Sequence, residues 1–174
     1  MPFSELLELA GGLREGRTLK AVIPGGTSTP LVPGDVMMSS VMSYDGMSKI
    51  GSMLGAGSVI VMDDTTCMVK TLERIAEFYY EESCGQCTPC REGTGWLYRV
   101  VKRIVHGEGT QEDLDRLLAV ANNISGNTIC ALGEAAATPV LSFIKYFEEE
   151  FQYQIDHQCC MVCSSRTSEA QSVL

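Results

Sequence analysis

The sequence predicts an α+β protein in which a small, strand-dominated unit precedes an all-α unit of four helices. Residues 1–65 alternate short extended runs with turns rich in glycine and proline, a pattern typical of strands joined by tight turns. Residues 66–155 instead repeat apolar side chains at helical spacing. Residues 156–174 lose this periodicity, so we expect a disordered tail rich in cysteine and serine there.

Two strands and a short helix are expected in the first unit. Residues 4–10 suit one or two helical turns. Leu19–Ile23 is a strand candidate that ends at Pro24, and Ser58–Met62 is a second one that ends at Asp63 and Asp64. Paired carboxylates at a strand end before a helix act far more often as a cap than as a catalytic pair. Further turns are expected at Pro30, at Pro33-Gly34 and at Asp45-Gly46.

Four sets of apolar residues predict the helices of the second unit. They are Leu72, Ile75, Ala76, Tyr79 and Tyr80; Trp96, Leu97, Val100, Val101, Ile104 and Val105; Leu114, Leu117, Leu118, Ala121 and Ile124; and Val140, Phe143, Ile144, Phe147 and Phe151. Helix-start signals stand at Thr88-Pro89 and Thr138-Pro139, and an end signal stands at His106-Gly107. Helices with such short connections predict a bundle.

The composition limits the classes of function. The chain has 174 residues, of which 45% are hydrophobic, enough to form the core of one or two small domains. No apolar run approaches the length of a membrane span, and we expect no secretory leader. The formal net charge is −9 without a Lys/Arg run, which disfavours nucleic acid and anionic membranes. We therefore expect neither a nucleic-acid partner nor direct membrane insertion.

The pattern of cysteines carries the strongest functional signal. Cys84, Cys87 and Cys90 stand three residues apart in the run SCGQCTPCREGTG, and Cys130 follows forty residues later in TICALG. Three close thiolates and one remote thiolate are typical of a chain that wraps a cubane iron–sulfur cluster. Without an export signal, clustered cysteines bind metal more often than they form disulfides. The spacing therefore predicts a cluster and one-electron chemistry.

Two other interpretations of these cysteines stay open at this level. A structural zinc site is the stronger rival, although zinc ligands usually come as two Cys-x2-Cys pairs. Four unrelated buried thiols form the weaker one. Near the C-terminus, His157, Cys159, Cys160 and Cys163 could form a second metal site or could be incidental thiols of a mobile tail. Cys67 has no neighbour at metal-binding spacing, and we expect it to be buried.

Positive charge is expected around the cluster. The three close cysteines precede the second predicted helix and Cys130 precedes the last one. Free N–H groups at these helix starts could donate to cluster sulfurs. Arg91 directly follows Cys90 and adds a full positive charge just outside the ligand set. Because the cluster is anionic, such donors stabilise its reduced form.

Four segments closely resemble one family. The run EESCGQCTPCREG, Glu81–Gly93, is similar to the flavoprotein subunit of respiratory NADH dehydrogenase, which is the F-type component of complex I. Asn123–Gly133, Ala21–Pro30 and Gly57–Asp64 continue the resemblance, which extends to about residue 158. It implies that 1–65 is a β-grasp-like, soluble-ligand-binding domain and that 66–155 is a helical [4Fe–4S]-binding domain.

The resemblance also implies a function. In that family the cysteines that match Cys84, Cys87, Cys90 and Cys130 bind a [4Fe–4S] cluster. The cluster relays single electrons from FMN, which NADH reduces, toward quinone. The implied partners are the [2Fe–2S] E-type subunit and the G-type subunit, in a peripheral arm at the cytoplasmic face of the bacterial inner membrane. Ala131 and Leu132 would face the flavin.

The chain also departs from the family pattern. The glycine-rich FMN and NADH loops of the family's N-terminal domain have no counterpart here, so we expect this chain alone to be inactive toward NADH. Two alternatives remain. One is a fragment of the diaphorase subunit of an NAD-linked hydrogenase or formate dehydrogenase. The other is a non-catalytic docking module in which the four cysteines hold structural zinc.

Overall fold

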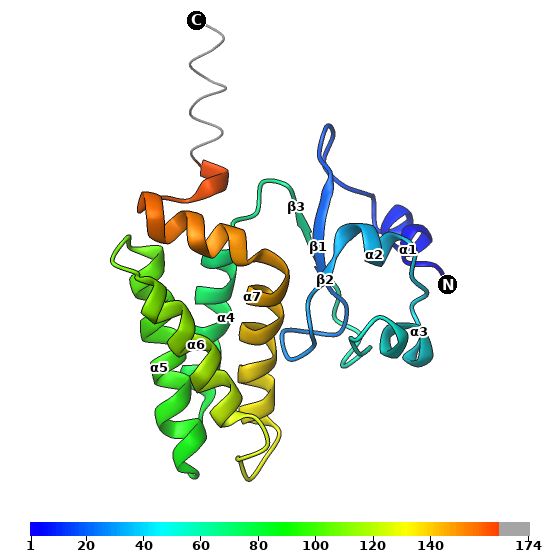
Figure 1. The fold of residues 1–174 in the computed structure, drawn as a ribbon. Coiled ribbons are helices and arrows are strands. Elements are labelled where there is room, and N and C mark those ends of the chain that lie inside the picture. The colour runs from blue at the N-terminus through cyan, green and yellow to red at the C-terminus, as the bar shows by residue number, and fades with distance from the viewer. Residues whose placement is uncertain (164–174) are drawn as a thin grey trace, which may run out of the picture. The chain divides into compact units, whose positions relative to one another are not determined.

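A computed structural model describes residues 1–163 and divides the chain into two compact units (Figure 1). The first unit comprises Met1–Thr66, and the second begins at Cys67. A small sheet with short helices forms the first unit, and long helices form the second. The predicted α+β class is therefore confirmed as a mixture of helices with a three-stranded sheet.

The sheet of the first unit is antiparallel throughout, in the order β2-β1-β3. The central strand β1 spans Leu19–Ile23 as expected, and its last three residues are buried. The edge strands are β2 at Val32–Pro33, which the sequence did not predict, and β3 at Ile60–Asp63. A register shift between Leu19 and Ala21 marks an irregularity in the β1–β3 pairing.

Three short helices accompany this sheet. They are α1 at Phe3–Leu9, α2 at Gly34–Met38 and α3 at Tyr44–Lys49. The last two stand where turns were expected. Their N-cap residues are Pro33 and Ser43, and proline and serine are common both in turns and at helix starts. The core gathers Phe3, Val22, Val32, Met37 and Met47.

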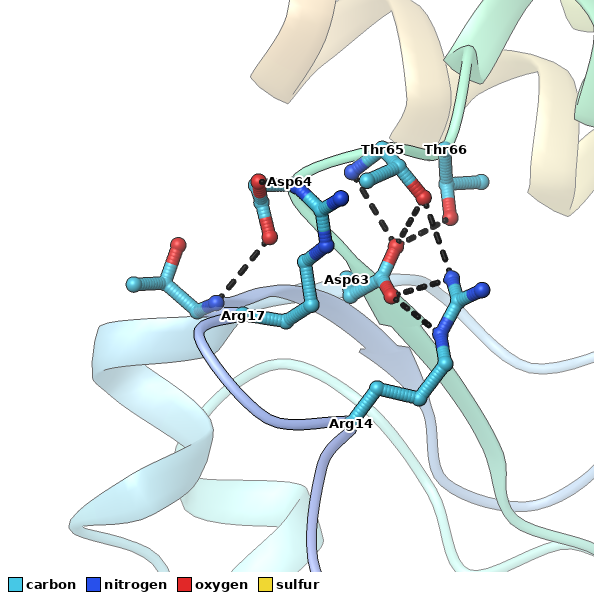
Figure 2. A network of polar contacts seen from close by, with 7 residues as sticks. Arg14, Arg17, Asp63, Asp64, Thr65 and Thr66 are labelled. Carbon is cyan, nitrogen blue, oxygen red and sulfur yellow. Dashed lines mark hydrogen bonds and ion pairs between the residues drawn. The ribbon is translucent and has the colours of Figure 1, made fainter.

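A polar network closes the end of β3 (Figure 2). The carboxylate of Asp63, whose side chain is 9% exposed, accepts hydrogen bonds from Arg14 at 2.6 Å and from the Thr65 hydroxyl at 2.6 Å. Its neighbour Asp64 accepts from the backbone N–H of Thr18 at 3.0 Å. The two carboxylates therefore have separate structural partners within the first unit. Contrary to the expectation from the sequence, neither caps the helix that follows, Met68–Glu82, because the N-cap of that helix is Cys67.

Four helices make up the described part of the second unit, residues 67–163. They are α4 at Met68–Glu82, α5 at Thr88–Val105, α6 at Gln111–Ile124 and α7 at Leu132–His157. Helices α4 and α6 both pack against α5 and α7, which buries the central residues of each apolar stripe. Tyr80 and Trp96, which the sequence placed in these stripes, are instead 42% and 53% exposed. Thr110 and Asp113 form a capping box at the start of α6. The end signal at His106 is confirmed as the C-cap of α5.

A kink at Phe147 bends α7, so its second half turns across one end of the helical unit (Figure 1). This half supplies polar contacts to two other helix ends. Glu150 accepts a hydrogen bond from the backbone N–H of Met68 at 3.1 Å, and Gln154 donates to the carbonyl of Val105 at 3.1 Å. Each contact satisfies a backbone group that a helix end leaves without an internal partner.

Two predictions for the last helix are wrong. It begins at Leu132 and contains Pro139 in its interior, rather than starting at Thr138-Pro139, because the three alanines at 135–137 favour helix. The tail predicted from residue 156 starts too early, because α7 continues to His157 and Cys160 is buried. The remainder of that tail, 164–174, lies outside the described residues. Across residues 1–163, no helix combines the length and apolar character needed to cross a bilayer.

Candidate metal centre

The three close cysteines surround the start of α5. Cys84 lies in the connection after α4, Cys87 is the N-cap of α5, and Cys90 is the third residue of the helix. Their exposure falls in that order, from exposed through half-buried to buried. Pro89 sits in the first turn, where the missing N–H costs no helical hydrogen bond. The local sequence thus places three thiols within two turns of one helix start.

Arg91 ties the connection before α5 to the helix. One guanidinium nitrogen donates to the carbonyl of Gly85 at 3.0 Å, and another pairs with Glu92 at 3.0 Å. Gly85 has a φ of +74°, which favours glycine because a Cβ is strained in that region. The side chain of Arg91 therefore holds the segment between Cys84 and Cys87 in addition to bringing positive charge.

Ser83 contacts the buried ligand candidate directly. Its hydroxyl lies 3.2 Å from the sulfur of Cys90. Thr94 donates to the carbonyl of Cys90 at 2.8 Å, which fixes the backbone at the same residue. Sequence reasoning missed Ser83, although its place directly before Cys84 was a usable signal.

The remote cysteine is held by a different set of contacts. Cys130 is exposed and precedes Ala131, the N-cap of α7. Glu134 closes the base of its loop by accepting hydrogen bonds from the hydroxyl of Ser125, at 2.7 Å, and from the N–H of Gly126. Both hydrogen bonds lower the pKa of the Glu134 carboxyl, and the bond from Ser125 has the larger effect.

The start of α7 also touches this loop. Thr128 donates to the carbonyl of Cys130 at 2.9 Å. A Cβ on Gly133 would overlap the side chain of Thr128, so glycine is required there by close approach. The sequence reasoning named none of Glu134, Thr128 and Gly133 as site residues, because their role depends on the folded loop.

The elements that carry the four thiols lie at the same end of the helical unit (Figure 1). All four are free thiols. Among residues 1–163, however, no three Cys, His, Asp or Glu side chains converge closely enough to form a ready metal site. The donor set itself fits an iron–sulfur cluster, because four thiolates are the ligands that a cubane takes. The tail candidates His157, Cys159, Cys160 and Cys163 likewise form no such group.

A family model matches the part of the chain that contains this centre. Residues 70–154 match the "NADH-ubiquinone oxidoreductase-F iron-sulfur binding region", and all four cysteines fall inside the match. Residues 70–154 are thus similar to this iron–sulfur region. The F-type iron–sulfur region thus spans most of α4 to α7, and the match indicates a [4Fe–4S] cluster as its cofactor.

Relatives extend the similarity beyond the F-type region. The chain is 51% identical over 158 residues to the F 1 subunit of NADH-quinone oxidoreductase of Rhizobium meliloti (strain 1021), covering 90% of this chain and 36% of that relative. It is 46% identical over 156 residues to the F subunit of the enzyme of the same name in Mycobacterium tuberculosis (strain ATCC 25618 / H37Rv), covering 90% and 35%. The chain thus spans about a third of the length of these relatives, which are named as oxidoreductase subunits.

A solved structure of a hydrogenase contains the same fold. The crystal structure of NAD+-reducing [NiFe]-hydrogenase in the H2-reduced state contains a chain that matches 89% of this one with a TM-score of 0.78 and 27% identity. The match covers 26% of that chain. The air-oxidised state of the same enzyme matches with a TM-score of 0.79. Most of this chain therefore shares its fold with part of a chain of an NAD+-reducing hydrogenase.

Proposed function

We propose that this chain is the electron-transfer part of the NADH-oxidising flavoprotein subunit of an NADH:quinone oxidoreductase. Cys84, Cys87, Cys90 and Cys130 are the ligands of its [4Fe–4S] cluster, which when bound supplies one-electron transfer between reduced FMN and further carriers toward quinone. The observation that carries the proposal is that the segments bearing the four cysteines lie at one end of the helical unit (Figure 1), within a matched iron–sulfur region.

Residues of both units have a place in this proposal. Residues 66–155 are the helical iron–sulfur domain, with α4 to α7 as a four-helix bundle, and 1–65 are the β-grasp-like domain. Because the thiols do not converge among the described residues, the segments around Cys84 and Cys130 draw inward when the cluster binds. Once Cys90 is an iron-bound thiolate, the Ser83 hydroxyl would donate to its sulfur, and Arg91 would offset the negative charge of the cluster.

The end of the helical unit that carries the four cysteines also has exposed apolar groups, which suit contact with a partner. Ile129, beside Cys130, is 75% exposed, and a pocket of about 330 Å³ lined by Pro89, Trp96 and Val120 opens next to α5. Apolar groups exposed together mark interaction sites. The family's FMN- and NADH-binding domain would place its flavin near Ala131 and Leu132. The [2Fe–2S] E-type and G-type subunits would be the other neighbours, in a peripheral arm at the cytoplasmic face of the bacterial inner membrane.

A second candidate function keeps the chemistry and changes the complex. The fold match to NAD+-reducing [NiFe]-hydrogenase favours a diaphorase subunit of a hydrogenase or formate dehydrogenase. Copurification of the native protein distinguishes the two: quinone-reductase subunits support the first proposal, and hydrogenase or formate dehydrogenase subunits support the second.

Metal and sulfide analysis tests the cluster. The full chain is reconstituted anaerobically with iron and sulfide, reduced with dithionite and examined by EPR. We expect about four irons and four sulfides per chain and the signal of a reduced cubane. Zinc without sulfide would instead establish the docking-module interpretation and end the redox proposal.

Paired variants test the ligand assignment. Cys130→Ser should lose the four-iron signal while circular dichroism shows unchanged helices. Cys159→Ser, which alters an exposed cysteine outside the ligand set, should keep the full signal. An unchanged cluster in Cys130→Ser would show that Cys130 is not a ligand.

A further inference from the structure

The loop that carries Cys130 has little packing to hold its tip. It connects the end of α6, at Ser125, to the start of α7, at Leu132. Ile129 is 75% exposed and the neighbouring Cys130 is exposed as well, so apolar contacts do little to fix this thiol. Polar contacts at the base of the loop therefore determine where the Cys130 thiol lies.

Two hydrogen bonds to Glu134, the third residue of α7, close the base of this loop. One carboxylate oxygen accepts from the hydroxyl of Ser125 at 2.7 Å, and the other accepts from the backbone N–H of Gly126. The bonded residues are nine and eight positions apart, with Cys130 between them. Hydrogen bonds to an ionised acceptor are stronger than neutral ones. Closing the base also shortens the segment that is free to move, which lowers the entropic cost of fixing Cys130.

The other polar contacts of the loop have a different reach. The side-chain amide of Asn127 donates back to the carbonyl of Asn123 at 3.2 Å, on the α6 side. Thr128 donates to the carbonyl of Cys130 at 2.9 Å, within the loop itself. In the described part of the chain, the bonds of Glu134 thus join the α6 end of the loop to α7.

We propose that Glu134 is the positioning residue of the fourth cluster ligand, an inference that rests on the proposed function, in which Cys130 binds the cluster. By tying Ser125 and Gly126 to the start of α7, its carboxylate restricts the positions that the Cys130 thiol can reach. Each iron of a cubane takes one thiolate. Without the two bonds the effective concentration of the Cys130 thiol at its iron falls, and that iron becomes the easiest of the four to remove.

Amide exchange in the metal-free full chain tests the bonds themselves. NMR follows the exchange of the Gly126 N–H with deuterium, which should be severalfold faster in Glu134→Ala than in the wild type. Glu134→Gln should stay near the wild-type rate, because its amide oxygen can accept from Gly126 while its amide nitrogen donates to the Ser125 hydroxyl. Equal exchange in Glu134→Ala and the wild type would overturn the proposal.

Iron retention in the cluster-loaded full chain tests the consequence for Cys130. A chelator is added, iron per chain is counted over time, and EPR follows the signal of the reduced cluster. Glu134→Ala should lose about one iron per chain severalfold faster than the wild type, with a matching loss of the four-iron signal. Glu134→Gln should retain its iron. Glu82→Ala, which removes an exposed carboxylate at the end of α4, is the control for charge and should behave as the wild type.

The variants separate this inference from the proposed function. A wild-type rate of iron loss in Glu134→Ala would refute the positioning role and leave the cluster assignment intact. Equally fast loss in Glu134→Ala and Glu134→Gln would show that charge, and not hydrogen bonding, is responsible. A wild-type chain that assembles no cluster would refute the proposed function and this inference with it. Ser125→Ala removes one bond and should lose iron at an intermediate rate, which decides the test if circular dichroism shows that Glu134→Ala folds poorly.

Discussion

The carboxylate of Glu150 accepts a hydrogen bond from the backbone N–H of Met68, 82 residues earlier in the chain. Met68 is the first residue of α4, and the N-cap residue Cys67 makes no side-chain capping bond. Glu150 therefore does for α4 what an N-cap side chain does for most helices. Its negative charge also lies at the positive end of the helix dipole. One side chain of α7 thus completes a helix that begins in a distant part of the sequence.

Removing this distant cap should destabilise the second unit. Glu150→Ala leaves the buried N–H of Met68 without its acceptor, which should cost about 1–3 kcal/mol of unfolding free energy. Urea denaturation followed by circular dichroism measures the loss. Glu149→Ala, at an exposed neighbouring position, should change the unfolding free energy little. Equal losses in the two variants would contradict the capping role.

Ser83 should set part of the cluster's reduction potential. Once Cys90 is an iron-bound thiolate, the hydroxyl 3.2 Å away can only donate to it. Ser83→Ala removes that donor and should lower the potential by some tens of millivolts, given that about 59 mV corresponds to tenfold in a one-electron equilibrium. An EPR-monitored redox titration measures the shift. Ser83→Thr keeps a hydroxyl and should restore most of it, whereas an unshifted Ser83→Ala would refute the contact.

Arg91 should slow the loss of iron. Arg91→Met removes the hydrogen bond to the Gly85 carbonyl and loosens the segment that carries Cys84. We expect severalfold faster iron loss to a chelator, followed by the decay of visible absorbance. Arg99→Met, two turns further along α5, is the matched control and should leave the rate unchanged. Arg91→Lys keeps the charge without the planar fork and should be intermediate.

The network at Asp63 should make the stability of the first unit depend on acid. Hydrogen bonds from Thr65, and next from Arg14, hold the pKa of the Asp63 carboxyl well below its ordinary value of 3.8. A depressed pKa contributes stability that is complete above about pH 4 and is lost as the pH falls toward the folded-state value. Asp63→Asn should therefore destabilise the unit at pH 7 and flatten its stability profile below pH 4.

Chemical denaturation at several pH values measures that profile. Asp35→Asn, at an exposed position on α2, serves as the control and should leave the acid limb in place. If the stability of Asp63→Asn still falls below pH 4 as in the wild type, other carboxylates cause this loss of stability. Arg14→Met should have a smaller effect than Asp63→Asn, since the Arg14 side chain is 73% exposed and water replaces its contact.

Local patterns predicted the elements that depend on neighbours in sequence. The apolar spacing predicted α4, α5 and α6, and Leu19–Ile23 predicted the central strand, because burial of one face imposes a period on the sequence itself. Prediction failed where local signals were ambiguous. Pro139 resembled a helix start but lies inside α7, and Asp45-Gly46 resembled a turn but lies inside α3.

The order of residues was enough to predict the cofactor chemistry, because the spacing of Cys84, Cys87 and Cys90 restricts which metal group the short loop can wrap. Only the folded structure shows which residues support that site and which residues distant in sequence contact each other. The contacts of Glu150 with Met68 and of Gln154 with Val105 both come from the half of α7 that lies beyond its bend at Phe147. Such contacts depend on how helices pack in three dimensions, which leaves no periodic trace in the order of residues.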